Sequence, residues 1–222
     1  SHMAATVYNN RAYVIGGLDK QVGIECQVYT SENNSWLFEF PSLPKGRFNS
    51  VCFVYRDSLY VFGGTDNSSN MNEIVRYDLS TQNSGEWTTI AKVNEANQRG
   101  GVAFVVEDKV YAGLGEKSNG FRNGFYVSSD SLTKWELIPS IPAQLGVISS
   151  GVYDEQKKSF FMIDNDGKIW EYNLTTEQWT SRSLWIRMKN YHMFMLDGSI
   201  YILGQDIYQK NKFTVYNPIW DN

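Results

Sequence analysis

Short apolar runs separated by polar turns recur along the whole chain. In LYVFGG, the apolar run Leu59–Phe62 is followed by Gly63 and Gly64. In the almost identical AYVIGG, the apolar run is followed by Gly16 and Gly17. The runs are rich in aromatic and β-branched residues, which favour strands. No 3.6-residue periodicity persists for more than two turns, so the pattern predicts an all-β protein.

The run before the glycines occurs five times, about 40 to 50 residues apart, which is typical of a repeat protein. An earlier apolar run precedes each copy, across a short turn that often contains Asn or Asp-Gly. Because these residues tolerate positive φ, the two runs are predicted to pair as an antiparallel hairpin. A third run follows, and a fourth opens with tryptophan in four copies. The aromatic anchors of the copies are Tyr13, Tyr60, Tyr111, Phe161 and Tyr201, and the tryptophans are Trp36, Trp87, Trp135 and Trp179.

Each repeat is therefore predicted to be a four-stranded antiparallel sheet with strands a to d. A sheet of this size cannot bury both faces alone, but several stacked around an axis can, as in a propeller. Residues 1–3, Ser-His-Met, are interpreted as the remnant of an expression tag. The single predicted domain, 4–222, divides into repeats at approximately 4–46, 47–97, 98–146, 147–186 and 187–222.

The glycine pairs and the tryptophans are predicted to be structural. Glycine permits a sharp turn at the end of strand b and a close approach by a neighbouring backbone. A phosphate-binding loop would need a helix after the glycines, and none is predicted. The tryptophans are expected to pack between adjacent sheets.

These features resemble the kelch-repeat family of β-propellers. The shared elements are the double glycine, the later Tyr77-Asp78 pair and the tryptophan after a polar loop. The resemblance covers 4–222 and is strongest in the first two repeats. Kelch propellers usually have six or seven blades, so the five repeats imply either a five-bladed ring with a trimmed last blade or an incomplete larger ring.

The third repeat also resembles the Asp-box hairpin of sialidase-type propellers. SSDSLTKW, at 128–135, matches that motif except that Leu132 replaces its glycine. In such hairpins the aspartate bonds to amides of its own turn, so Asp130 is interpreted as structural rather than catalytic.

Composition narrows the range of partners. The net charge is -4, the pI is about 5.3 and no run of Lys or Arg is present, which argues against nucleic acid or an anionic membrane as the main partner. No apolar stretch approaches the ~18 residues that suggest a membrane span. Cys26 and Cys52 are expected to be buried free thiols.

Candidate binding residues fall where connections d–a would meet the long b–c loops on one face. Long polar loops on a rigid scaffold are the usual binding elements of such folds. Kelch domains often present arginines before strand a, and three converging arginines would suit an anionic ligand. The alternative is that they bond to carbonyl groups of the blades or to solvent. The candidates are Arg47, Asn49, Arg99, Arg187, Asn190 and Tyr191.

No catalytic set can be assembled from the sequence. His192 is the only histidine outside the tag, and it is expected to pack in strand a of the fifth repeat. A copper site like that of galactose oxidase would need two histidines, so no metal or cofactor is predicted. The best enzymatic alternative is a sialic-acid epimerase or sialidase that uses the arginines on a carboxylate.

The sequence is therefore interpreted as a non-catalytic module that binds a protein or a glycan on the b–c and d–a face. A cytoplasmic kelch adaptor is the other alternative. Export or surface display is slightly favoured, because the loops are rich in Asn and Ser and the repeats lack the regular Tyr-Asp-Pro of adaptors. The sequence predicts no oligomeric state.

Overall fold

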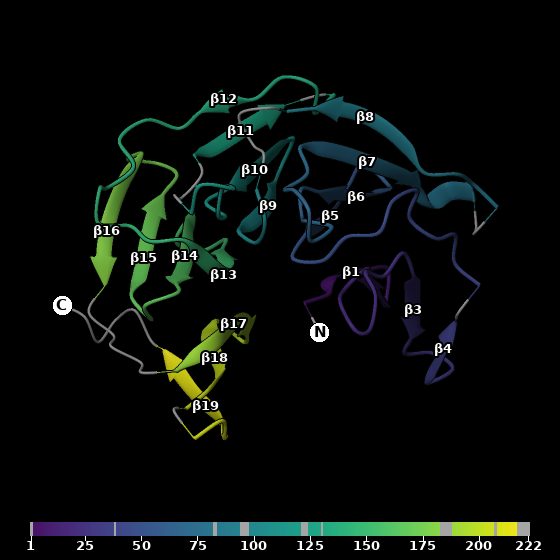
Figure 1. The fold of residues 1–222 in the computed structure, drawn as a ribbon. Coiled ribbons are helices and arrows are strands. Elements are labelled where there is room, and N and C mark those ends of the chain that lie inside the picture. The colour runs from purple at the N-terminus through teal and green to yellow at the C-terminus, as the bar shows by residue number, and fades with distance from the viewer. Residues whose placement is uncertain are drawn as a thin grey trace. The chain divides into compact units, whose positions relative to one another are not determined.

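The computed structural model describes residues 2–37, 39–81, 84–93, 98–120, 124–129, 131–182, 188–206 and 208–216. Its regular structure is almost entirely strand, with one short 3₁₀ helix, η1 (Leu79–Thr81). The chain divides into two compact units, Ser1–Leu137 and Ile138–Asn222 (Figure 1). No helix in the described part of the chain is long and apolar enough to cross a membrane.

Unit 1 holds three sheets, each of four antiparallel strands in chain order. The first sheet consists of β1 (Ala4–Tyr8), β2 (Arg11–Ile15), β3 (Cys26–Thr30) and β4 (Ser35–Leu37). The second consists of β5 (Val51–Tyr55), β6 (Ser58–Phe62), β7 (Glu73–Asp78) and β8 (Thr88–Lys92). The third consists of β9 (Val102–Val106), β10 (Lys109–Gly113), β11 (Phe125–Ser129) and β12 (Glu136–Leu137).

Unit 2 holds two further sheets of the same meander type. The fourth sheet consists of β13 (Ile148–Asp154), β14 (Ser159–Asp164), β15 (Ile169–Asn173) and β16 (Gln178–Arg182). The fifth has three strands within the described residues: β17 (Lys189–Leu196), β18 (Ser199–Gln205) and β19 (Asn211–Tyr216). The predicted all-β class and the five repeated propeller blades are confirmed.

The a–b hairpins take their register from the predicted turns. Asn9 and Asn10 both have positive φ, as do Arg56 and Asp57, and Asp197 precedes Gly198 with the same sign. Two consecutive residues of positive φ form the tight turn whose twist matches that of the flanking strands. This turn fixes the pairing of β1 with β2 and of β5 with β6.

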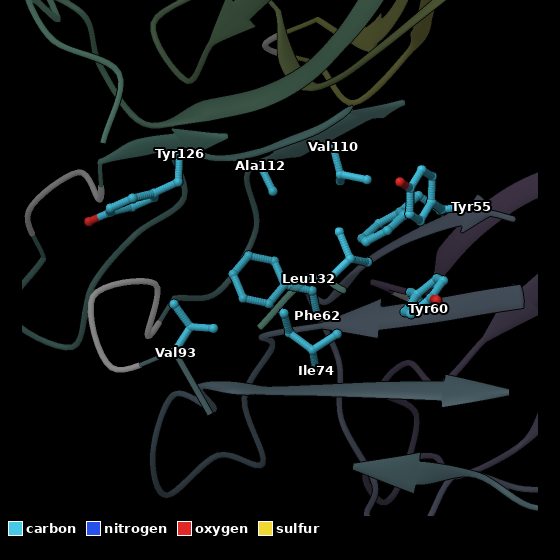
Figure 2. Packing of buried hydrophobic residues seen from close by; sticks show 10 residues of the cluster. Tyr55, Tyr60, Phe62, Ile74, Val93, Val110, Ala112, Tyr126 and Leu132 are labelled. Atoms are coloured by element: carbon cyan, nitrogen blue, oxygen red, sulfur yellow. The ribbon is translucent and has the colours of Figure 1, made fainter. Parts of the chain in front are cut away.

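The second sheet is buried on both faces. One face packs on the first sheet through Leu59, Val61 and Tyr77, and the other packs on the third sheet through Phe62 and Ile74. Figure 2 shows Phe62 and Ile74 facing the third sheet's Val110 and Ala112. Every residue of β6 is consequently buried, although strands usually alternate.

Two of the tryptophans of unit 1 that open d strands, Trp87 and Trp135, pack across these junctions, whereas the expectation is wrong for Trp36, which is 46% exposed and contacts Tyr29 of its own sheet. The Trp135 ring stacks on Phe62 of the second sheet with centroids 5.8 Å apart. Trp87 approaches Phe40, which follows the first sheet, and its indole N–H donates to the carbonyl oxygen of Pro41 at 2.9 Å. The rings of Trp87 and Trp135 thus bury apolar area between two sheets.

The glycines at the end of strand b lie where the next connection approaches. Gly16 has φ +63°, and a Cβ on it would lie 2.3 Å from the carbonyl oxygen of Arg47. The amide of Gly17 donates to that same oxygen at 2.9 Å. At Gly63, an added Cβ would lie 2.7 Å from the carbonyl oxygen of Gln98. A side chain at either glycine would therefore displace the connection that enters the next sheet.

Asp130, the Asp-box candidate, lies outside the described residues. The residues on either side of it, 124–129 and 131–135, are described. Leu132, which stands where the motif has glycine, has φ +57°, and its carbonyl oxygen accepts a hydrogen bond from the Trp135 indole at 3.0 Å.

Candidate functional site

In unit 1, the b–c loops and the d–a connections meet through backbone hydrogen bonds. Phe48 exchanges two bonds with Thr65, at 3.0 and 3.1 Å, and Arg99 exchanges two with Glu116, at 2.8 and 3.0 Å. Each connection therefore extends its own sheet by one bridge before strand a begins. These bridges hold the candidate residues on fixed backbone rather than on free loops.

Arg47 is fully buried, and its guanidinium points into the protein. One Nη1 hydrogen bond reaches the carbonyl oxygen of Gly63 at 3.2 Å, and Nη2 lies 3.6 Å from the Glu73 carboxylate. Burial lowers the pKa of Arg47, although the Glu73 carboxylate opposes this shift. These contacts join the d–a connection to the second sheet, as in the alternative that the sequence left open.

Gln98 takes the place of Arg47 in the third sheet. Its backbone carbonyl accepts from Gly64 at 2.9 Å, as the carbonyl of Arg47 accepts from Gly17. Its side-chain oxygen accepts the amide of Gly115 at 3.1 Å. Arg47 and Gln98 therefore clamp two successive sheets. Sequence reasoning missed Gln98 because it searched for a repeated arginine rather than for a repeated hydrogen-bonding role.

Arg99 lies one step further along and is exposed. It is equivalent to Phe48, not to Arg47, because both form the bridge to the b–c loop. Its guanidinium binds the Glu116 carboxylate, with Nη2–Oε2 at 2.9 Å and Nε–Oε2 at 3.1 Å. Arg47 lies four residues before the first residue of β5, and Arg99 lies three residues before the first residue of β9. The two arginines therefore occupy different structural positions.

A second exposed ion pair and an amide complete this surface. Lys45 Nζ lies 2.7 Å from Asp66, and the Asn70 side chain donates to the carbonyl oxygen of Glu116 at 2.9 Å. The Asn70 bond ties the loop of the second sheet to that of the third. Both Lys45 and Arg99 face a carboxylate, so the surface offers donors and acceptors together.

Asn49 is half-buried and has φ +50°, a conformation that Asn tolerates. Its amide donates to the carbonyl oxygen of His2 at 2.9 Å, and its carbonyl accepts from Gly100 at 2.6 Å. Its backbone thus links the start of the first sheet with the start of the third sheet.

In unit 2 the candidates separate. Asn190 is exposed at φ +56°, and its side chain donates to the Gln205 side chain at 3.0 Å, which donates to Asn211 at 3.3 Å. Tyr191 is buried, and its hydroxyl accepts the amide of Met188 at 3.0 Å. Arg187 lies outside the described residues. The exposed group is therefore a row of amides, of which sequence reasoning identified only Asn190.

Aspartates organise the b–c loops of the second and fifth sheets. Asp66 accepts the amides of Ser68 and Ser69, and Asp206 accepts those of Tyr208 and Lys210. The hydrogen bond from Lys45 and these two serine amides lower the pKa of Asp66 to about 2. In Asp206 the loop amides and Lys212 lower the pKa in the same direction. Both aspartates are ionised at neutral pH and rigidify their loops.

The only histidine outside the tag remnant lies on the fifth sheet. His192 is exposed on β17 opposite Leu203, although it was expected to pack. Among the described residues, no group of three or more His, Cys, Asp or Glu side chains is arranged to hold a metal ion.

Comparisons with known proteins find similarity to kelch-repeat proteins. The model of the Kelch motif matches residues 46–94. Mouse Kelch-like protein 36 is 27% identical over 161 residues, covering 67% of this chain and 25% of the relative. Kelch repeat and BTB domain-containing protein 1 of ectromelia virus (strain Moscow) is 25% identical, covering 96% of this chain and 39% of the relative. The chain thus spans well under half the length of these relatives.

The fold is also shared with a solved structure. The structure of YjhT superposes with a TM-score of 0.79 over 98% of this chain and 84% of that chain, at 16% sequence identity. At this identity the match establishes the fold and leaves the activity open.

Proposed function

We propose, on the premise that the chain belongs to the kelch-repeat family of β-propellers, that it is a non-catalytic protein-interaction module. Its partner would dock on the face formed by the b–c loops and the d–a connections. The observation that carries the proposal is the exposed surface of unit 1, where ion pairs and amides are held by backbone bridges.

The chemistry of that surface favours a polypeptide over a single small acid. The exposed cations Lys45 and Arg99 are each already paired with a carboxylate, and Arg47 is buried. A lone carboxylate ligand would have to compete with Asp66 or Glu116 for its cation. A polypeptide carrying both charges can instead meet both members of each pair.

The relatives named above also support a protein partner. One of them carries a BTB domain by name, and both are longer than this chain, so an adaptor role for a longer protein is part of the proposal. A glycan is the second candidate. The exposed amide row Asn190–Gln205–Asn211 favours it, because side-chain amides can both donate to and accept from sugar hydroxyls.

The test is a selection of displayed peptides of mixed charge against the wild-type protein, followed by affinity measurement on variants. Arg99→Glu is expected to weaken the affinity for the selected peptides about tenfold or more, because the new carboxylate repels the peptide carboxylate that would pair with Arg99. Arg56→Glu is the matched control, since Arg56 is also exposed and ion-paired, with Asp108, but lies on an a–b turn.

Equal effects of the two variants, or none from Arg99→Glu, would contradict the proposed face. A glycan array probed with wild type and with Asn190→Ala tests the second candidate. Turnover of sialic-acid substrates that Arg99→Ala abolishes would instead establish the enzymatic alternative.

A further inference from the structure

Two exposed ion pairs of unit 1 are joined through one side-chain amide. Lys45 Nζ lies 2.7 Å from Asp66 Oδ2 beside the second sheet. Beside the third sheet, Arg99 Nη2 lies 2.9 Å from Glu116 Oε2. Asn70 belongs to the same b–c loop as Asp66, and its side chain donates to the carbonyl oxygen of Glu116 at 2.9 Å. The contacts therefore follow one order: cation, carboxylate, amide, carboxylate, cation. We call this the charge row; its residues are Lys45, Asp66, Asn70, Glu116 and Arg99.

The centre of the charge row holds unused hydrogen-bond acceptors. Both N–H contacts from Arg99 end on Oε2 of Glu116, so Oε1 of that carboxylate accepts no hydrogen bond from the described residues. The side-chain oxygen of Asn70 also accepts none within the described part of the chain, since only its NH2 group is bonded. Asp66 accepts two serine amides and Lys45, whereas an ionised carboxylate can accept about four hydrogen bonds. The centre of the row is therefore complementary to cationic groups, which only donate.

The two ends of the charge row carry the opposite chemistry and project further. The side chain of Lys45 is 55% exposed and that of Arg99 is 44% exposed. The side chains of Asp66 and Glu116 are only 21% and 31% exposed. Ammonium and guanidinium groups carry several N–H donors each, more than these ion pairs use. Each end of the row therefore keeps donors for an acidic group of a partner.

We propose, on the basis of the function proposed above, that the charge row binds a polypeptide segment with the charge order acid, base, base, acid. The two basic residues would lie on the carboxylates of Asp66 and Glu116, and the two acidic residues would meet Lys45 and Arg99. Arginine fits the centre better than lysine, because its planar guanidinium can bond a carboxylate and the Asn70 oxygen together. A uniformly acidic segment would instead bring carboxylates against the two carboxylates of the row.

The test compares two sets of dye-labelled peptides of identical composition by fluorescence anisotropy at low ionic strength. One set has the order Glu-Arg-Arg-Glu and the other the order Arg-Glu-Glu-Arg, with glycine–serine spacers of several lengths between the charged residues. Neither set has a net charge, so a surface that merely attracts mixed charges would bind both equally. The best Glu-Arg-Arg-Glu peptide is expected to bind at least about tenfold more tightly than the best peptide of the other order.

Exchanging the members of one ion pair tests the order of charges within the protein. Arg99→Glu combined with Glu116→Arg keeps an ion pair and the net charge but places a cation at the centre. This exchange should weaken binding of the preferred peptide about tenfold, because one arginine of the peptide then faces another arginine. Arg56→Glu combined with Asp108→Arg is the matched control, because that exposed pair lies on the a–b turns. The control exchange should leave the affinity unchanged.

Thermal unfolding checks that the exchanged protein is folded. If it is not, Glu116→Gln replaces it, because this variant keeps the shape of the side chain and removes only its charge. It should also weaken binding of the preferred peptide, by about fivefold.

Equal affinity for the two charge orders, or tighter binding of the Arg-Glu-Glu-Arg peptides, would overturn the inference. Failure of both sets to bind the wild-type protein would overturn it as well. An unchanged preference after the exchange at Arg99 and Glu116 would place the peptide elsewhere and have the same consequence. In each case the proposed function would still stand if peptides selected without a fixed charge order lost more affinity to Arg99→Glu than to Arg56→Glu.

Discussion

The first and fourth sheets end strand b at equivalent positions by different means. In the first sheet, Gly16 and Gly17 follow β2, and the carbonyl of Arg47 from the next connection packs against them. In the fourth sheet, Asp164 and Asn165 hold these two positions, and the amide of Asn165 bonds to Val147 at the start of its own sheet. The loop that follows is long in the first sheet and short in the fourth.

The difference shows what the glycine pair is for. Where a neighbouring carbonyl lies against the strand end, no side chain fits. In the fourth sheet, where the strand end bonds to its own sheet through Asn165, a buried carboxylate occupies the same position and organises the loop. Asp164 accepts the amides of Asp166 at 3.0 Å and Lys168 at 2.9 Å, and it accepts the Trp170 indole at 3.1 Å. The fourth sheet therefore lacks the glycine pair because a buried aspartate, Asp164, takes over the role of ending strand b.

The largest effect is expected from Gly16→Ala. The new Cβ would lie 2.3 Å from the carbonyl oxygen of Arg47, at a residue whose φ is also unfavourable for alanine. Clash and strain together should lower the free energy of unfolding by about 3 kcal/mol. Gly120→Ala is the control, because Gly120 has φ +80° but open space around it, and should cost about 1 kcal/mol. Urea unfolding measures both, and equal losses would show that close approach is irrelevant.

A smaller loss is expected from Asp164→Ala. Two loop amides and a buried indole would lose their acceptor, which should cost about 2 kcal/mol. Asp164→Asn keeps an oxygen for the two amides and loses only the indole bond, so it should cost about half as much. The order is measured by thermal unfolding with near-UV circular dichroism of the tryptophans. An Asn variant as unstable as the Ala variant would mean that the charge, not the acceptor geometry, stabilises the loop.

These cases explain how much could be predicted from the sequence. Strand pairing and the five repeats were predictable because side-chain alternation, Asn-rich turns and glycine pairs are local signals. The role of Gln98 was not, because its equivalence to Arg47 depends on backbone bonds between sheets rather than on residue type. The burial of Arg47 likewise depends on its contacts with Gly63 and Glu73, and the exposure of His192 depends on which face of β17 the neighbouring sheet covers.

The exposed loop of the second sheet should be sensitive to acid, which sharpens the contrast with buried Asp164. Asp66 has a folded pKa of about 2, below the ordinary value of about 3.9, through Lys45 and two serine amides. Its stabilising effect is therefore complete above about pH 4 and is lost as the pH falls through about 2. Hydrogen exchange at Ser68 and Ser69 should accelerate over that range beyond the intrinsic pH dependence. Asp66→Asn should remove this extra acceleration, and its persistence in that variant would assign it to another group.

The smallest effect concerns Cys26, which pairs with Ile15 immediately before Gly16. Burial raises the pKa of the Cys26 thiol to about 12, so at neutral pH it is both protonated and shielded, and iodoacetamide should label it only when the first sheet opens. Gly16→Ala should speed this labelling, because it weakens the contact with Arg47 that holds the strand end. Peptide mapping by mass spectrometry separates Cys26 from Cys52, and Asp164→Ala serves as the control because it perturbs unit 2. If Asp164→Ala accelerated labelling of Cys26 as strongly as Gly16→Ala, the two strand ends would open together, and the comparison between independent capping devices would fail.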